Sequence, residues 1–160
     1  SMKKVLITGV SGFAGSYLAE YLVDLKKFEV SGTYLLEESK INISKVKDRI
    51  KLIKTDLSLE TPVFDLLKKI RPSLIFHLAS LTSPADSFKN PTGTIVNNIM
   101  LQINLLEAVK KNNLFNTKIL IVSSADIYGA VEKKDLPIDE DTKLMPTSPY
   151  SVSKIAQDFL

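Results

Sequence analysis

The chain has no cysteine and only one histidine, His77, among its 160 residues. The lack of cysteine excludes disulfides, zinc–thiolate sites and a cysteine nucleophile, and a single histidine excludes a multi-histidine metal site. We therefore expect no metal centre. The lack of cysteine also agrees with a reducing compartment.

Long apolar runs and runs of one charge are missing as well. No stretch reaches the ~18 uninterrupted apolar residues that indicate a membrane span, and no secretory signal opens the chain. We therefore expect a cytoplasmic protein that does not bind membranes. The net charge is +3, but the lysines are scattered among acids, which indicates solubility rather than nucleic-acid binding. Ser1, before Met2, is expected to be the remnant of an expression tag.

What the chain does contain is an alternation of short apolar runs and longer segments with helical periodicity. This pattern predicts an α/β protein with a doubly wound parallel sheet, helices on both faces, and a single domain spanning residues 1–160. Residues 36–48 carry little signal. Five strands are expected at 3–8, 28–34, 49–56, 73–79 and 118–124, and helices at 13–26, 60–70, 93–112 and from 149 onward.

The long helix at 93–112 is apolar on two sides. One side carries Ile99, Ile103 and Leu106, and the other carries Leu101, Leu105 and Ala108. A helix with two apolar faces is buried on both, so a second helix or another subunit should cover the side away from the sheet. We expect a homodimer formed through helices. A strictly monomeric sedimentation profile at high concentration would contradict this expectation.

The segment TGVSGFAG lies between the first expected strand and the first expected helix. In this setting the glycines are typical of a dinucleotide-binding turn, because they permit a tight exit from the strand, close approach of the pyrophosphate and close helix–strand packing. A merely structural turn is the less favoured alternative. The turn predicts a Rossmann fold, with cofactor contacts from Gly9, Ser11, Gly12, Phe13, Ala14 and Gly15.

The end of the second strand does not distinguish NAD from NADP. An acid there would accept a hydrogen bond from the ribose 2′-hydroxyl, and an arginine would bind a 2′-phosphate. Tyr34 stands at this place, and Glu37 and Glu38 follow late. The cofactor is therefore expected to be NAD or NADP, with Tyr34 as one of its contacts.

Two further strand ends point to the cofactor. Asp56, followed by Leu57, can accept from the adenine amino group or cap the next helix, and both interpretations stay open. The fourth strand ends in HLAS, so the backbone of Leu78, Ala79 and Ser80 is expected at the ligand-binding edge of the sheet. His77 itself is interpreted as a structural residue.

The motifs TGxxGxxG, TDL, HLAS, SSADIYG and SPYSVSK occur in this order along the chain. Together they resemble the extended short-chain dehydrogenase/reductase family, which comprises nucleotide-sugar epimerases, dehydratases and reductases, and the resemblance covers the whole chain. Tyr150 and Lys154, four residues apart, share one face of the last helix. The resemblance implies that Tyr150 is the catalytic acid/base and that Lys154 holds the nicotinamide ribose and lowers the tyrosine pKa.

The resemblance assigns roles to the SSAD segment too. Ser124 would donate a hydrogen bond to the substrate oxygen that Tyr150 serves, and Ser123 would pack or touch the cofactor. Asp126 stands where the dehydratases carry glutamate, while Ala125 replaces the acid that often precedes it. Because water elimination needs an acid for the leaving hydroxyl, this alanine weakens a dehydratase interpretation.

Three segments, GVSGFAGSYLAEYL, LIFHLASLTSPADSF and LMPTSPYSVSK, look most like GDP-6-deoxy-4-keto-mannose reductases and their GDP-mannose dehydratase relatives. The resemblance thus implies an NAD(P)-dependent enzyme that reduces a GDP-linked 4-keto-6-deoxy sugar. A 4,6-dehydratase, a 4-epimerase and a non-catalytic dinucleotide-binding module stay open as alternatives.

The chain departs from the family pattern in two places. The family usually carries Asn-x-x-Gly-Thr in the long helix, but here Asn98 is followed by Leu101 and Gln102. The family also continues for about as long again after the position of Leu160, with a region that binds the nucleotide sugar. We therefore expect the 160-residue chain by itself to have little or no turnover.

Overall fold

The computed structural model describes residues 2–160, which divide into two compact units. Unit 1 contains residues 2–80 and 100–122, and unit 2 contains residues 81–99 and 123–160. In residues 2–160, no helix combines the length and the apolar character needed to cross a bilayer.

Unit 1 contains a five-stranded, all-parallel sheet in the order β3-β2-β1-β4-β5. The predicted doubly wound parallel sheet is confirmed. From β1 the chain adds β2 and β3 toward one edge of the sheet. It then crosses back to place β4 on the other side of β1 and adds β5 at the opposite edge, so the strand order reverses between β1 and β4. The strands are β1 (Lys3–Thr8), β2 (Phe28–Tyr34), β3 (Lys51–Lys54), β4 (Leu74–His77) and β5 (Lys118–Ile121).

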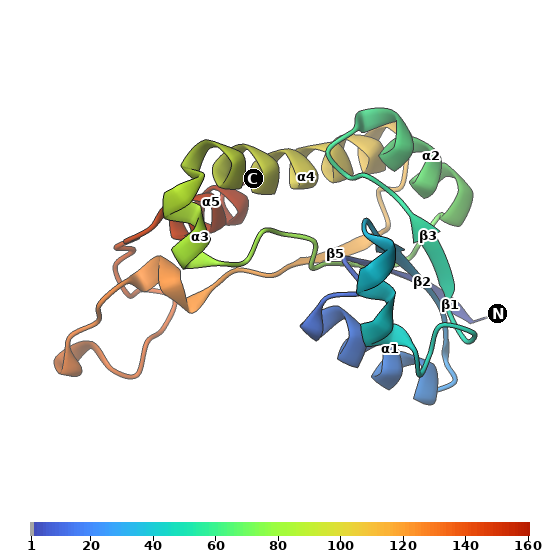
Figure 1. Cartoon of the computed structure of the whole chain (residues 1–160), viewed down its shortest axis with the longest axis horizontal. Coiled ribbons are helices and arrows are strands. Elements are labelled where there is room, and N and C mark those ends of the chain that lie inside the picture. The colour runs from blue at the N-terminus through green and yellow to red at the C-terminus, as the bar shows by residue number, and fades with distance from the viewer. Residues whose placement is uncertain (1) are drawn as a thin grey trace. The chain divides into compact units, whose positions relative to one another are not determined.

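Helices cover both faces of this sheet, as the alternation of side chains along β1 requires. Val5 and Ile7 pack in one cluster with α1 (Phe13–Asp24) and the 3₁₀ helix η1 (Glu37–Ile43). Leu6 packs in the other cluster with α2 (Glu60–Ile70) and the second half of α4 (Pro91–Lys111). Figure 1 shows α1 and α2 on opposite sides of the strands. Each of these fully buried aliphatic side chains contributes about 1.5–3 kcal/mol.

Three strands are shorter than predicted because hydrogen bonding ends before the apolar pattern does. β4 stops at His77, which pairs with Ile121, and the next two N–H groups turn to the Thr8 hydroxyl instead. β5 consequently ends at Ile121 rather than at 124. β3 is limited to the four residues that pair with β2.

Helix bounds differ from prediction by a few residues at two helices. The first ends at Asp24 rather than 26, and Lys26 adopts a left-handed conformation with φ of 53°. The long helix α4 begins two residues early, at Pro91, because the Asn90 side chain accepts a hydrogen bond from the Gly93 N–H (2.9 Å). On its outer side Ile103 and Leu106 are half-buried, and the dimer stays a prediction.

Unit 2 is mostly helical. α5 begins at Pro149, as predicted, because Ser148 and Ser151 form a reciprocal capping box at its start. The buried Asn98 side chain accepts from the Leu81 N–H (2.8 Å) and donates to the Ser153 hydroxyl (3.0 Å), which joins α4 to α5 within this unit. The remaining elements are α3 (Pro84–Lys89), η2 (Ala125–Tyr128), η3 (Lys133–Asp135) and α5 (Pro149–Asp158).

Candidate functional site

The turn after β1 has no room for side chains at two of its glycines. Gly9 has a φ of +68°, and a Cβ atom there would lie 2.9 Å from the Ala79 Cα atom. A Cβ atom on Gly15 would lie 2.4 Å from the Gly9 carbonyl oxygen. The predicted tight exit from the strand and the close helix–strand packing are therefore both present.

Gly12 differs from its two neighbours, because an added Cβ atom would meet only the Gly9 carbonyl oxygen, at 3.3 Å. It is the residue before α1, whose start carries no side-chain cap and no acidic residue in its first turn. The first-turn N–H groups of a helix attract anions. An uncapped helix start beside an open glycine fits a pyrophosphate, so this part of unit 1 fits a dinucleotide.

The end of β4 is held to β1 by the Thr8 hydroxyl. Its oxygen accepts from the N–H groups of Leu78 (3.1 Å) and Ala79 (3.2 Å), and it lies 2.8 Å from His77 Nδ1. Because the hydroxyl oxygen accepts from both N–H groups, its one proton is left to donate to His77 Nδ1. His77 is thus a buried, hydrogen-bonded strand residue. The N–H groups of Leu78 and Ala79 are therefore hydrogen-bonded inside the protein.

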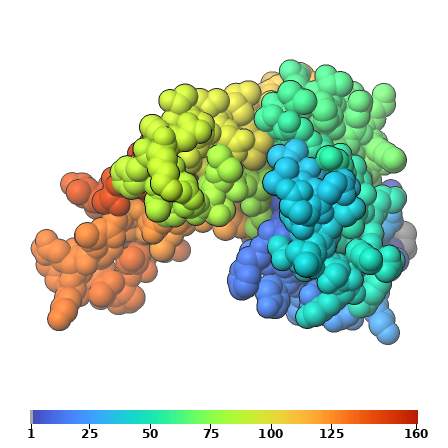
Figure 2. Space-filling view, in the orientation of Figure 1, coloured from blue at the N-terminus to red at the C-terminus, as the bar shows by residue number. Residues whose placement is uncertain are grey.

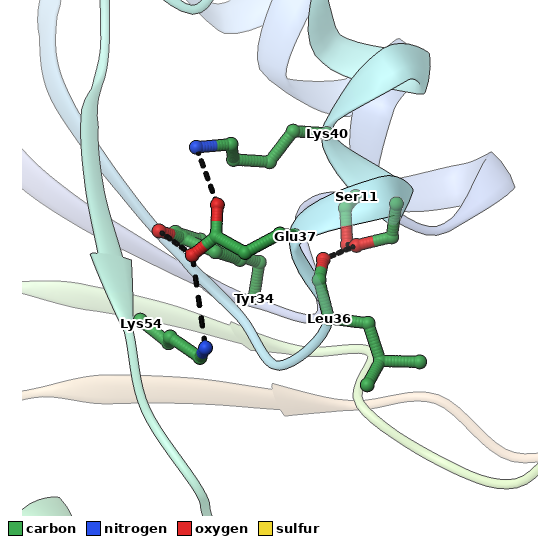
Figure 3. Close-up of polar contacts among 7 residues, drawn as sticks. Ser11, Tyr34, Leu36, Glu37, Lys40 and Lys54 are labelled. Atoms are coloured by element: carbon green, nitrogen blue, oxygen red, sulfur yellow. Dashed lines mark hydrogen bonds and ion pairs between the residues drawn. The ribbon is translucent and has the colours of Figure 1, made fainter.

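A charged cluster that the sequence did not suggest lies after β2 (Figure 3). We call Tyr34, Glu37, Lys40 and Lys54 the β2-end cluster. The Tyr34 hydroxyl donates a hydrogen bond to Glu37 Oε1 (3.2 Å). Lys40 Nζ lies 2.8 Å from Glu37 Oε2, and Lys54 Nζ lies 3.7 Å from Glu37 Oε1. The Lys40 hydrogen bond holds the pKa of Glu37 below its ordinary value, and Glu37 in turn raises the pKa of Lys40. The spacing of three residues from Tyr34 to Glu37 and on to Lys40 was the available signal.

The 3₁₀ helix η1, which carries Glu37 and Lys40, is hydrogen-bonded directly to the glycine turn. The Ser39 hydroxyl lies 2.8 Å from Ser11 Oγ, and Asn42 Nδ2 donates to the Ser11 carbonyl oxygen (2.8 Å). The Ser11 hydroxyl and carbonyl are therefore engaged by η1. Figure 2 shows η1, in light blue, at the surface of unit 1.

Asp56 makes a local turn. Its Oδ1 atom accepts from the N–H (2.9 Å) and the hydroxyl (2.6 Å) of Ser58. The residue that precedes α2 is Leu59, which has no side-chain cap, so the interpretation of Asp56 as the helix cap is wrong. The adenine contact stays a prediction, as does a contact from Leu57, which is buried in the core under α2.

In unit 2, the capping box fixes the first turn of α5 and thereby the directions of Tyr150 and Lys154. Both side chains are buried, at 8% and 5% exposure, whereas Val152 between them is exposed. The predicted common face of the helix is therefore an inward face, not a solvated one. A lysine is almost never fully buried unless its charge is paired, and titratable groups with perturbed pKa values cluster at functional sites.

The other predicted catalytic residues lie at η2, which packs against α5 within unit 2. Ser124 precedes η2, and its hydroxyl oxygen accepts from the Asp126 N–H (3.2 Å), so the hydroxyl proton points elsewhere and can be donated. Asp126 itself is exposed. The Ser123 hydroxyl donates to Asp158 Oδ2 (3.1 Å), which agrees with a packing role for Ser123.

Burial lowers the pKa of Lys154 from its ordinary value, and the nearby Asp158 charge offsets this only in part. The folded state then binds fewer protons than the unfolded state between the lowered pKa and about 10.5, so stability rises with pH across that window. We expect Lys154→Met to raise the urea midpoint at pH 7 and to lose this advantage as the pH approaches 10. Lys133→Met, in the exposed η3, is the matched control and should leave the midpoint unchanged; equal midpoints for Lys154→Met and the parent at pH 7 would contradict the expectation.

A family model described as GDP-mannose 4,6 dehydratase matches residues 6–160. The chain belongs to the GDP-mannose 4,6 dehydratase family. Among similar proteins of this and neighbouring families, a GDP-mannose 4,6-dehydratase of Yersinia enterocolitica is 35% identical over 96% of the chain and 43% of that protein. A GDP-6-deoxy-D-mannose reductase of Pseudomonas aeruginosa is 31% identical over 99% of the chain and 46% of that protein.

Solved structures agree with the fold. The UDP-glucose 4-epimerase of Thermus thermophilus, in a complex with NAD, superposes with a TM-score of 0.85 and is 28% identical, over 98% of the chain and 49% of that protein. The chain thus spans less than half the length of each of these three relatives. The family resemblance inferred from the ordered motifs is confirmed.

Proposed function

We propose that this chain is the NAD(P)-binding part of a nucleotide-sugar oxidoreductase, and that the whole protein reduces a GDP-linked 4-keto-6-deoxy sugar in the cytoplasm. The observation that carries the proposal is the burial of Tyr150 and Lys154 on one face of α5. Burying a phenol hydroxyl and an ammonium group costs free energy, because both lose contact with water. The same two groups, held in fixed positions, can serve in proton transfer.

In the proposed reaction a ketone becomes a secondary alcohol, so the carbon receives a hydride and the oxygen a proton. The nicotinamide ring supplies the hydride when the cofactor is bound. Tyr150 gives its phenol proton to the sugar oxygen, and Ser124 donates a hydrogen bond to the same oxygen as negative charge develops there. Lys154 holds the nicotinamide ribose and stabilises the phenolate that Tyr150 becomes.

In unit 1, the residues proposed to hold the cofactor follow the ends of four strands. Tyr150 and Lys154 are added on the family resemblance alone. Pyrophosphate would lie over the open Gly12 at the start of α1. The whole set is Gly9, Ser11, Gly12, Phe13, Ala14, Gly15, Tyr34, Asp56, Leu57, Leu78, Ala79, Ser80, Tyr150 and Lys154.

A 4,6-dehydratase is the second candidate, and the match to the dehydratase family model favours it. Against it stands Ala125, which leaves no acid directly after Ser124 for expulsion of a hydroxyl. A substrate test separates the two. We expect the whole protein to oxidise NAD(P)H when given GDP-4-keto-6-deoxymannose and to leave GDP-mannose unchanged. Conversion of GDP-mannose to its 4-keto-6-deoxy form would instead establish the dehydratase.

A further inference from the structure

We propose that Glu37 makes this protein select NAD over NADP, by accepting a hydrogen bond from the ribose 2′-hydroxyl and by occupying the two lysines that would otherwise bind a 2′-phosphate. The inference rests on the proposed dinucleotide site at the glycine turn. It answers the question that the end of β2 leaves open in the sequence.

The β2-end cluster lies where the adenosine ribose of a bound dinucleotide would be found. In doubly wound sheets the group that reads the 2′ position follows the second strand, beside the glycine turn. Tyr34 is the last residue of β2, and η1 is bonded to the turn through Ser39 and Asn42. Glu37 lies in the first turn of η1, three residues after the end of β2. It therefore lies near the carboxyl end of β2, beside the glycine turn, although it does not occupy the last position of the strand.

The Glu37 carboxylate keeps room for one more donor. It has about four lone-pair positions, of which Tyr34 and Lys40 take one each by hydrogen bonds, while Lys54 stands further off as an ion pair. A ribose hydroxyl can donate to the remaining capacity without displacing any of them. Tyr34, Lys40 and Lys54 converge on this carboxylate from three sides in Figure 3, which holds it in place.

A 2′-phosphate meets the opposite situation. It carries between one and two negative charges near pH 7, by analogy with other phosphate monoesters (about −1.5 to −2). Placed at the cluster, it would be repelled by the Glu37 carboxylate and would share Lys40 and Lys54 with that carboxylate. The lysines suited to a phosphate are thus present, but their positive charges are already balanced in part by Glu37.

The decisive variant is Glu37→Gln. It keeps the shape of the side chain and removes the charge, and because the ion pairs of Glu37 are exposed their loss should have little effect on folding. Binding of NAD and of NADP to the purified protein is measured by titration calorimetry. We expect the parent to bind NAD at least about tenfold more tightly than NADP, and Glu37→Gln to narrow that ratio about tenfold, mainly through tighter NADP binding.

Two controls isolate the cluster. Glu38→Gln removes the neighbouring charge, which joins none of the ion pairs recorded in residues 2–160, and should leave the ratio unchanged. Adding Lys40→Met and Lys54→Met to Glu37→Gln should abolish the gain in NADP affinity, because the lysines released by Glu37 are then gone.

Equal or tighter binding of NADP by the parent would overturn the inference, as would an unchanged ratio in Glu37→Gln; either result leaves the proposed dinucleotide site standing. If neither dinucleotide binds, the inference and the proposed site both fail.

Discussion

Replacing Tyr150 with phenylalanine is expected to lower turnover of the whole protein on GDP-4-keto-6-deoxymannose by about 10²- to 10⁴-fold, the range usual for loss of a positioned proton donor. The phenyl ring fills the same buried space on α5, so folding should be retained. NAD(P)H oxidation at saturating cofactor measures the effect.

Tyr17→Phe is the matched control for this experiment. It removes the same hydroxyl from an exposed tyrosine of α1, which contacts Phe13 with ring centroids 5.1 Å apart, and should leave the rate unchanged. Calorimetric binding of the dinucleotide to Tyr150→Phe separates a lost proton donor from a lost cofactor. A variant as fast as the parent would refute the assigned role of Tyr150.

Gly12→Ala is expected to lower dinucleotide affinity and Gly15→Ala to lower stability, although both variants place one methyl group in the same turn. The Gly12 backbone (φ −72°, ψ 171°) is ordinary for alanine, and the added carbon meets one atom at 3.3 Å. Its stability should change by less than about 1 kcal/mol, while dinucleotide affinity falls at least about tenfold because the methyl occupies the approach to the helix start.

In Gly15→Ala the added carbon falls 2.4 Å from the Gly9 carbonyl oxygen and 2.9 Å from the Val10 Cα atom. Alanine within a helix normally stabilises by about 1 kcal/mol over glycine, so the clash reverses the sign, and we expect a loss of about 1–3 kcal/mol. Urea unfolding and calorimetry with NAD measure both variants. Unimpaired NAD binding by Gly12→Ala would contradict the proposed position of the pyrophosphate over Gly12.

The fold was predictable because its signals are local. β1 reads as a buried strand, and the side-chain alternation in Val5, Leu6 and Ile7 already implies cover on both faces of the sheet. The Ser148–Pro149 pair likewise marks the start of α5 correctly. Strand ends were predicted less well, because β4 and β5 stop where the Thr8 hydroxyl takes the next N–H groups, a contact that spans about 70 residues.

In the candidate site, too, the residues of local motifs were predicted and those brought together by distant contacts were not. The glycine turn, Ser124, Tyr150 and Lys154 were recognisable because each belongs to a short motif with its own spacing. The β2-end cluster was not, since Lys54 reaches Glu37 only through the pairing of β2 with β3. Asp56 was misread as a possible helix cap because its turn to Ser58 is decided by backbone geometry.

The sequence by itself determined the order of strands and helices, the glycine turn and the residue types available for proton transfer, because periodicity and motif spacing act between near neighbours in the chain. Only the tertiary structure decided that Lys154 is buried with a lowered pKa and that two lysines converge on Glu37. Burial and charge pairing depend on which distant segments meet in space, and that information is distributed over the whole chain.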